Sequence, residues 1–203
     1  MYFENRYDAA RQLAPLLEKY KDQDPVILAI PRGGVPIGCY IAKQLGAPLD
    51  LLMVKKIGHP QNSEYAVGAV FLEGEQIDER DDIPEVYFKE QTANIRKQLQ
   101  KRYINFCSNK KPIDISNKSV IIIDDGIATG RTIQACISCI RNKHPKQIII
   151  AVPVSSEEAK EKILPFVDEF ISLHIPYPFI GVGRFYSDFS QVEDTEVKSL
   201  LAN

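Results

Sequence analysis

Residues 120–132, with the sequence VIIIDDGIATGRT, constrain the fold more than any other part of the chain. The stretch opens with four β-branched residues, which are too few for a helix and too apolar for an exposed strand. Two carboxylates, Asp124 and Asp125, follow, and a loop of small residues then leads into an expected helix over 132–143. Glycines permit a tight turn with inward-pointing amides, and a helix N-terminus adds positive potential. The stretch therefore predicts a central strand that ends in a phosphate-binding loop beside an acidic pair.

A second loop of this kind follows the first aliphatic run, at 26–30. It consists of Pro31, Arg32, Gly33 and Gly34, and it leads into an expected helix over 35–45. Taken alone, an arginine beside two glycines is typical of an exposed turn. These residues, however, stand one strand–helix unit before the acidic pair. That position favours a second anion site.

Further strands are expected at 147–152 and 167–173, with a helix at 155–164 between them. Strands that alternate with helices favour a parallel sheet covered on both faces. We therefore expect an α/β fold of three layers, with a mostly parallel central sheet flanked by helices. At 203 residues the chain is expected to form a single domain over 1–203, with a core at about 25–173. Ligands bind such sheets at the carboxyl ends of the strands, where both loops would converge.

The two loops resemble those of the type I phosphoribosyltransferases, whose signature is a hydrophobic strand, two acidic residues and a loop ending in T-G-x-T. The resemblance implies the substrate phosphoribosyl diphosphate (PRPP). It implies that Asp124 and Asp125 form the catalytic centre, where they hold the ribose hydroxyls and bind Mg²⁺ directly or through water. It also implies seven residues that bind the 5′-phosphate, namely Gly126, Ile127, Ala128, Thr129, Gly130, Arg131 and Thr132. An ordinary strand-to-helix turn would account for one acidic cap, but not for the second carboxylate and both threonines.

In this family the loop after the first core strand binds pyrophosphate through amides exposed by an unusual peptide conformation. The resemblance therefore implies pyrophosphate binding by Pro31, Arg32, Gly33 and Gly34. Lys55 and Lys56 join this set because they follow an expected strand over 49–54, although two lysines fit a solvated edge equally well. The polar segment 59–65 matches a flexible loop that closes over PRPP and excludes water in the family.

The region 174–203 stands where the family has a variable hood that holds the acceptor. Its aromatic residues Phe179, Phe185 and Tyr186 are candidates for contact with a planar base. Packing of the carboxyl-terminal region against the sheet explains these aromatics at least as well. A long charged helix is expected at about 84–107, outside the minimal family core, and its basic residues fit a solvated face better than a partner surface.

The implied reaction is displacement of pyrophosphate from C1 of PRPP by a nitrogen of a small-molecule acceptor. The chain as a whole resembles a group of phosphoribosyltransferase-like proteins whose acceptor is unsettled. Hypoxanthine-guanine enzymes carry an aspartate where this chain has Ala128, which disfavours a 6-oxopurine mechanism of their type. Three alternatives stay open: a non-catalytic sensor of PRPP or a nucleotide, a phosphoribosyl hydrolase, and a transferase that works in the opposite direction by phosphorolysis of a nucleotide.

Charge and hydropathy exclude some partners. Lys and Arg number 25 against 27 Asp and Glu, without a long basic run, so general nucleic-acid binding is not expected. No apolar run approaches the ~20 residues that span a bilayer, and the first residues lack the apolar stretch of a signal peptide. We therefore expect a cytoplasmic protein without a membrane partner, for which a homo-oligomer is compatible with the sequence. Cys136 and Cys139 have C-x-x-C spacing, but their place inside an expected helix indicates packing.

Overall fold

The computed structural model describes residues 2–77, 82–108 and 110–202, without the side chains of Glu64 and Thr132. Its core is a five-stranded sheet in which all neighbouring strands are parallel, in the order β2-β1-β6-β7-β8. The strands are β1 Pro25–Ala29, β2 Leu49–Leu51, β6 Ser119–Ile123, β7 Gln147–Val154 and β8 Glu169–His174. The aliphatic run before the acidic pair is thus the central strand, as predicted, and every residue of β6 is buried.

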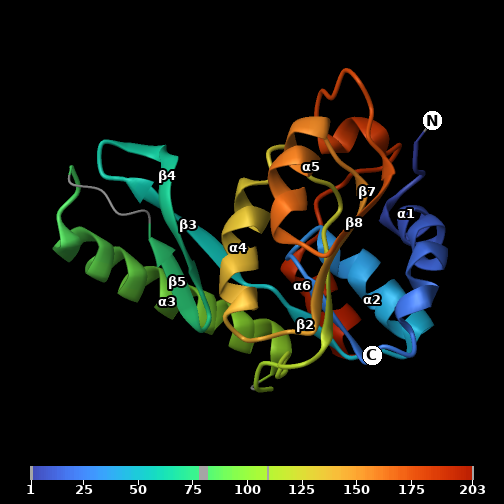
Figure 1. The fold of residues 1–203 in the computed structure, drawn as a ribbon, viewed down its shortest axis with the longest axis horizontal. Coiled ribbons are helices and arrows are strands. Elements are labelled where there is room, and N and C mark those ends of the chain that lie inside the picture. Colours follow the sequence, from blue (N-terminus) through green and yellow to red (C-terminus); the bar gives the residue numbers. More distant parts are fainter. Residues whose placement is uncertain (1, 78–81, 109, 203) are drawn as a thin grey trace.

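Helices cover both faces of this sheet, which confirms the predicted three layers (Figure 1). They are α1 Arg6–Leu13, continued by the 3-10 helix η1 Ala14–Tyr20, then α2 Gly34–Leu45, α4 Arg131–Arg141, and α5 Glu157–Ile163, continued by η2 Leu164–Phe166. Alternate side chains of β6 point to opposite faces. Ile121 and Ile123 pack with α1 and α2, whereas Ile122 packs with α4 and α5.

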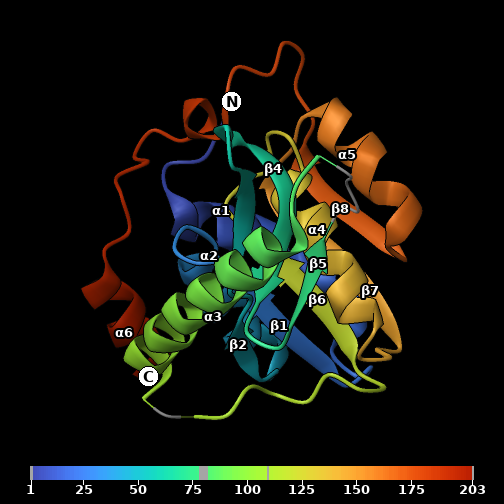
Figure 2. The ribbon, with the colours of Figure 1, turned by 90° about the vertical axis from the view of Figure 1, so that its left-hand side faces the viewer.

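A second, antiparallel sheet stands beside the core and is covered by a long helix. Its strands are β3 Val54–His59, β4 Asn62–Phe71 and β5 Gly74–Ile77, and the helix is α3 Glu85–Cys107. We call these four elements the hood; Figure 2 views it from its own side, with α3 crossing in front of the strands. The expected helix at 84–107 is confirmed. No helix in the described ranges is long and apolar enough to cross a membrane.

The hood corrects two sequence predictions. The expected strand over 49–54 is two strands, because β2 ends at Leu51 and β3 starts at Val54 in the other sheet. Leu52 and Met53 between them are buried, so the apolar run continues although the strand does not. Lys55 and Lys56 therefore lie within β3 and not at the carboxyl end of a core strand. The predicted loop at 59–65 is instead the tip of the β3–β4 hairpin.

The region expected to hold the acceptor, 174–203, packs in its described part along the amino terminus. The amide of Phe3 donates to the carbonyl of Phe185 at 2.8 Å, and the amide of Ser187 donates to the carbonyl of Phe3 at 2.9 Å. After the 3-10 helix η3 Val182–Phe185, the last described helix is α6 Asp194–Ala202. Val197 of α6 is fully buried in a cluster that includes residues of α2 and α3.

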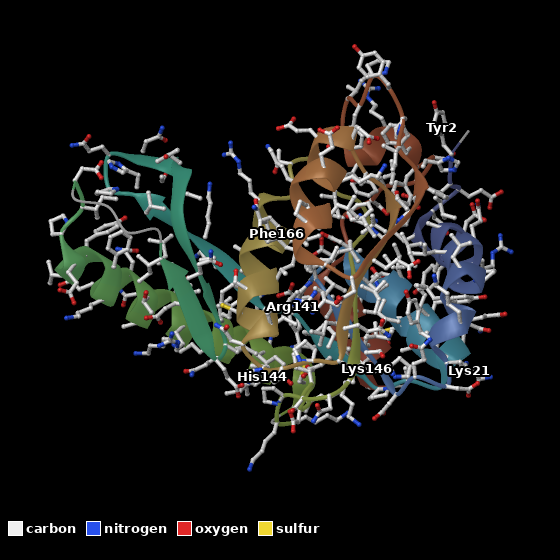
Figure 3. All side chains as sticks on the ribbon, in the orientation of Figure 1. Tyr2, Lys21, Arg141, His144, Lys146 and Phe166 are labelled. Atoms are coloured by element: carbon white, nitrogen blue, oxygen red, sulfur yellow. The ribbon has the colours of Figure 1, made fainter. Side chains whose placement is uncertain are left out.

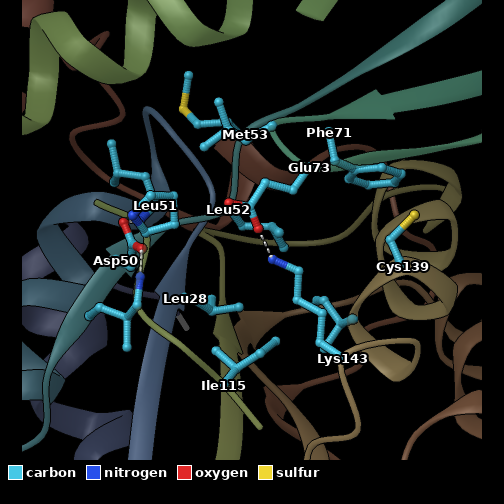
Figure 4. A pocket seen from close by; sticks show the side chains of 14 residues that line it. Leu28, Asp50, Leu51, Leu52, Met53, Phe71, Glu73, Ile115, Cys139 and Lys143 are labelled. Carbon is cyan, nitrogen blue, oxygen red and sulfur yellow. Dashed lines mark hydrogen bonds and ion pairs between the residues drawn. The ribbon is translucent and has the colours of Figure 1, made fainter. Parts of the chain in front are cut away.

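A buried carboxylate ties the hood to the core. Asp50 of β2 accepts hydrogen bonds from the amides of Leu51 and Ile113, at 2.7 and 2.8 Å, and from the hydroxyl of Tyr103 on α3 at 2.8 Å. Figure 4 shows the small pocket beside it, of about 70 Å³, with the ion pair between Lys143 and Glu73 at its rim. None of the predicted site residues lines this pocket, so we assign Asp50 a structural role.

Candidate functional site

The acidic pair follows β6 directly, and an arginine from the start of the chain binds its second member. Asn5 caps α1 by accepting hydrogen bonds from two amides, which places Arg6 at the first helical position. The Nε of Arg6 donates to Oδ2 of Asp125 at 2.9 Å, and its Nη2 lies 2.8 Å from the same oxygen. Both side chains are largely buried, with 10% and 14% exposed. Asp125 is therefore a charged acceptor held in one orientation.

The two carboxylates influence one another. The amide of Asp125 donates to Oδ1 of Asp124 at 2.8 Å, so the side chains lie close together. Burial raises the pKa of Asp124 well above its ordinary value, and the charge of Asp125 raises it further. Burial also raises the pKa of Asp125, while the adjacent Arg6 opposes that shift. A ligand that donates hydrogen bonds or brings positive charge to this pair would therefore stabilise its ionised form.

The 126–132 loop is fixed at its start and open at its end. The amide of Ile127 donates to the carbonyl of Val154 at 2.9 Å, and Ser156 donates its hydroxyl to the carbonyl of Ala128 at 2.6 Å. Ile127 is buried, so this residue anchors the loop and does not offer a free amide. Four consecutive amides have no hydrogen-bond partner among the described residues, those of Ala128, Thr129, Gly130 and Arg131.

These four amides stand at the beginning of α4, where the helix potential is positive. Gly130 has a φ of 69°, a left-handed conformation that favours glycine, and it allows the sharp entry into the helix. Such a turn forms an anion-binding concavity. The side chain of Thr132, also predicted to bind phosphate, lies outside the described part of the structure.

The 31–34 loop packs against the acidic pair. The Pro31–Arg32 peptide is cis, and the amides of Arg32 and Gly33 have no hydrogen-bond partner in the part of the chain that the structure describes. A Cβ atom on Gly33 would lie 1.9 Å from Oδ2 of Asp125, and one on Gly34 would lie 2.6 Å from the carbonyl oxygen of Ile123. Only glycines permit this approach, which brings both predicted anion loops to one carboxylate pair.

The side chains predicted to support the 31–34 loop lie in different places. Arg32 is 27% exposed, and its Nη1 lies 3.5 Å from Oδ1 of Asp194. Lys55 and Lys56 are neighbours in β3, so their side chains leave opposite faces of the hood sheet. Lys55 donates to Oε1 of Gln98 on α3 at 2.8 Å and is thus directed toward α3.

The predicted acceptor-binding aromatics belong mainly to the scaffold. Phe185 and Tyr186 are only 5% and 7% exposed, in a cluster with Phe3 and Val154. The hydroxyl of Tyr186 donates to the carbonyl of Asp125 at 2.6 Å, so it supports the acidic pair from behind. Phe179 is partly exposed and stacks on Phe185, with ring centroids 5.5 Å apart. The N-terminal segment covers Phe185 and Tyr186, so their burial favours the alternative that these aromatics pack the carboxyl-terminal region against the sheet.

A cleft of about 890 Å³ lies between the hood sheet and α4. Arg131 belongs both to its lining and to the 126–132 loop, so the cleft opens beside the predicted phosphate site. Gly68 and Gln76 line the hood side, while Arg141 and Phe166, labelled in Figure 3, lie at the opposite end of α4 and beyond it. The sequence could not predict this cleft, because it depends on where the hood stands.

Residues 4–178 match the family model for the phosphoribosyl transferase domain. The chain belongs to this family. A provisionally named phosphoribosyl transferase of Mycobacterium tuberculosis H37Rv is 35% identical over 204 residues, which is 98% of this chain and 46% of that relative. The chain thus spans about half the length of this curated relative. The bifunctional protein PyrR of Clostridium novyi is 29% identical over 163 residues, covering 79% of this chain and 73% of that protein.

Solved structures have a similar fold. The crystal structure of the protein TT1426 from Thermus thermophilus superposes with a TM-score of 0.88 at 34% identity, covering 99% of this chain and 98% of that one. A hypoxanthine phosphoribosyltransferase of Staphylococcus aureus has a TM-score of 0.51 at 15% identity, over 85% of this chain and 74% of that one, and it shows the shared fold alone.

Sequence reasoning missed one residue at the centre of this phosphoribosyl transferase domain. Arg6 carries no local signal, because an arginine in the first turn of an amphipathic helix is usually solvated. Its guanidinium group instead lies 4.1 Å from the ring centroid of Phe189 and donates to the carbonyl of Ser190 at 2.8 Å. The N-terminal helix and the carboxyl-terminal region thus meet over Asp125.

Proposed function

We propose that this domain is a PRPP-dependent phosphoribosyltransferase, which transfers the 5-phosphoribosyl group to a nitrogen of a small, nucleobase-like acceptor and releases pyrophosphate. One observation supports this most strongly. Two loops with unpartnered amides flank a single carboxylate pair, and Gly33 lies directly against Asp125. PRPP carries a phosphate at one end, a diol in the middle and a diphosphate at the other end, in the same order as these groups.

Each part of the site then has a role. The amides from Ala128 to Arg131 receive the 5′-phosphate at the start of α4. Asp124 and Asp125 accept hydrogen bonds from the ribose hydroxyls and hold C1 in line between donor and acceptor. The amides of the 31–34 loop, with Arg32, receive the diphosphate.

The reaction breaks the bond between C1 and the pyrophosphate oxygen and forms a bond between C1 and the acceptor nitrogen. The leaving pyrophosphate keeps the electron pair, and the acceptor nitrogen loses its proton to solvent or to the leaving group. The ribosyl group is positively charged in the transition state, so the fixed carboxylates stabilise it. The free amides of the 31–34 loop stabilise the charge that develops on the leaving group.

We also propose Mg²⁺ as the cofactor, held chiefly at Asp124. No group of three or more metal-ligating side chains occurs among the residues described. Mg²⁺ typically needs only one or two carboxylates, because substrate phosphates and waters complete its coordination. Asp124 fits this requirement, whereas an oxygen of Asp125 is already bound by Arg6. When bound, Mg²⁺ would offset the charge of the diphosphate.

The 126–132 loop also bears on the identity of the acceptor. Ala128 is exposed in the 126–132 loop and offers only a methyl group where hypoxanthine-guanine enzymes of the family carry an aspartate. We therefore propose an acceptor other than a 6-oxopurine. It would approach C1 beside the ribose, and the partly exposed Phe179 stays a candidate contact.

A second candidate function is a non-catalytic sensor of PRPP or a nucleotide. The observation that favours it is the burial of Phe185 and Tyr186, which leaves neither ring free to stack on an acceptor base. The phosphate loops and the acidic pair would serve a sensor equally well. Binding without turnover distinguishes this function from the enzyme.

The test is a pyrophosphate-release assay with PRPP, Mg²⁺ and a panel of purine, pyrimidine and other nitrogen acceptors. The control is the Asp124→Asn/Asp125→Asn double variant, which keeps the side-chain volumes and removes both charges. Acceptor-dependent release by the wild type and not by the double variant would support the enzyme. PRPP binding without release for any acceptor would favour the sensor. Failure to bind PRPP would refute the transferase and the sensor of PRPP.

A further inference from the structure

Two arginines from separate elements converge on one carboxylate oxygen at the start of α6. The Nη1 of Arg32, in the 31–34 loop, lies 3.5 Å from Oδ1 of Asp194, and the Nη2 of Arg102, on hood helix α3, lies 3.6 Å from the same oxygen. Oε2 of Glu193 lies 3.7 Å from the Nη1 of Arg32. One cluster of charged side chains therefore joins three elements: the 31–34 loop, the hood and the last described helix.

The cluster is partly solvated. Asp194 is 46% exposed, Arg102 is 44% exposed and Arg32 is 27% exposed. Ion pairs at this exposure contribute little to stability, because water screens them and the long side chains lose entropy. Asp194 can therefore be displaced at small cost. The two guanidinium groups, by contrast, would repel each other without an anion between them.

An oxygen shared by two guanidinium groups occupies a position that suits a phosphoryl oxygen. We propose that Arg102 is a second cationic ligand of the diphosphate group and that Asp194 occupies this place while the diphosphate is absent. The proposal rests on the proposed function, since it assigns the 31–34 loop to the diphosphate. Asp194, assisted by Glu193, is then an internal competitor that the ligand displaces from both arginines.

The position of α6 gives this exchange a structural consequence. Val197 of α6 packs in one cluster with Val35 of α2 and with Leu99 and Tyr103 of α3. The Sγ of Cys39 on α2 also lies 3.8 Å from the carbonyl oxygen of Leu200, as a weak hydrogen bond. Helix α6 thus contacts both the helix that follows the 31–34 loop and the helix that carries Arg102. Diphosphate binding would transfer Arg102 from α6 to the ligand and so link the hood to the occupied site.

The competing explanation is that Asp194 is merely an acidic residue at a helix N-terminus, which interacts favourably with the helix dipole. Glu196 lies in the same first turn and is separate from both arginines in the described ion pairs. Glu196→Gln therefore removes the same charge from the same helix end. Lys101→Gln is the corresponding control for Arg102→Gln, because Lys101 is the exposed neighbour of Arg102 on α3 and its replacement also removes one positive charge.

The experiment is calorimetric titration of inorganic pyrophosphate at constant Mg²⁺, with ribose 5-phosphate as a second probe that lacks the diphosphate. We expect Asp194→Asn to tighten pyrophosphate binding about three- to tenfold and Arg102→Gln to weaken it about tenfold. The two control variants should stay within about twofold of the wild type. Ribose 5-phosphate affinity should not change in any variant. Melting temperatures within about 2 °C of the wild type would show that each variant is folded.

The outcomes separate this inference from the function on which it rests. Equal effects of Asp194→Asn and Glu196→Gln on pyrophosphate affinity, or of Arg102→Gln and Lys101→Gln, would overturn the inference. Such a result would mean that the affinity depends on the net charge near the site and not on these particular side chains. Pyrophosphate binding that no variant alters would also overturn it while leaving the transferase intact. Failure of the wild type and all variants to bind either probe would overturn both.

Discussion

The guanidinium group of Arg6 lies 2.8 Å from the carboxylate of Asp125, although the two residues are 119 positions apart. Arg6 approaches the carboxylate from one side, and Gly33 packs against the same carboxylate. Tyr186 supports it through the backbone carbonyl. The proposed ribose site is therefore built by both ends of the chain as well as by the loop that carries the acidic pair.

Arg6→Gln should destabilise the fold and weaken PRPP binding. Removal of one partner from a buried ion pair leaves an uncompensated charge and typically costs about 3–5 kcal/mol. Arg11→Gln is the matched control, because Arg11 is 63% exposed in its ion pair with Asp8, where water screens the interaction and its loss should have little effect on stability. Urea unfolding of both variants measures the difference. Similar small losses for the two would mean that Arg6 does not hold Asp125.

Asp124→Asn should make the protein more stable at neutral pH while abolishing PRPP binding. Burial and the charge of Asp125 raise the pKa of Asp124 in the folded protein above its unfolded value, so ionisation of Asp124 opposes folding. This penalty is absent below the unfolded pKa of about 3.9 and develops as the pH rises through the folded pKa. The variant should therefore melt at the same temperature as the wild type near pH 3.5 and at a higher temperature at neutral pH.

Melting curves across this pH range test the Asp124 prediction. Asp22→Asn, at an exposed position, is the control and should follow the wild type at every pH. A melting temperature of Asp124→Asn that is lower than the wild type at neutral pH would show that the carboxylate stabilises the fold instead.

Gly33→Ala should lower PRPP affinity at least tenfold. Gly33 has a φ of -60°, which alanine tolerates, so the effect comes from the methyl group meeting Oδ2 of Asp125. Gly46→Ala is the matched control, since Gly46 has a φ of 63° with nothing within 4 Å of the added methyl group. That variant should lose about 1 kcal/mol of stability through backbone strain and keep its PRPP affinity. Calorimetry with PRPP compares the two variants. Equal PRPP affinities would show that the 31–34 loop does not take part in PRPP binding.

Arg32→Ala should weaken PRPP binding by roughly one to two orders of magnitude, because a charge-assisted contact to phosphate contributes about 1.5–3 kcal/mol. Ribose 5-phosphate, which lacks the diphosphate, should bind as before. Isothermal titration with both ligands measures the contrast. A comparable loss for the two ligands, together with a lower melting temperature, would assign Arg32 to the scaffold.

The sequence predicts those parts of the candidate site that are formed by residues adjacent in the chain. A buried strand, two carboxylates, a glycine loop and a helix start follow one another around Asp124, and the 31–34 loop repeats this order. A parallel sheet then places both loops at one edge without further information. The order of the core strands and helices follows from the same local patterns.

The remaining parts depend on contacts between distant segments. Arg6 reaches Asp125 because α1 packs beside the sheet, and Phe3 from the amino terminus packs against the ring of Tyr186. The position predicted for Lys55 and Lys56, at the end of a core strand, is wrong because Leu52 and Met53 stay buried while the chain passes from one sheet to the other. Burial of side chains does not report which sheet a strand joins, so local pattern alone predicts a single strand there.

A crystal structure with PRPP and Mg²⁺ tests the central claim most directly, because it locates both ends of the ligand. The account predicts the 5′-phosphate within hydrogen-bonding distance of the amides from Ala128 to Arg131, and the ribose hydroxyls on Asp124 and Asp125. It also predicts the diphosphate at the amides of Arg32 and Gly33. A phosphate bound elsewhere, such as beside Arg141 in the cleft along α4, with the 126–132 loop empty, would contradict it.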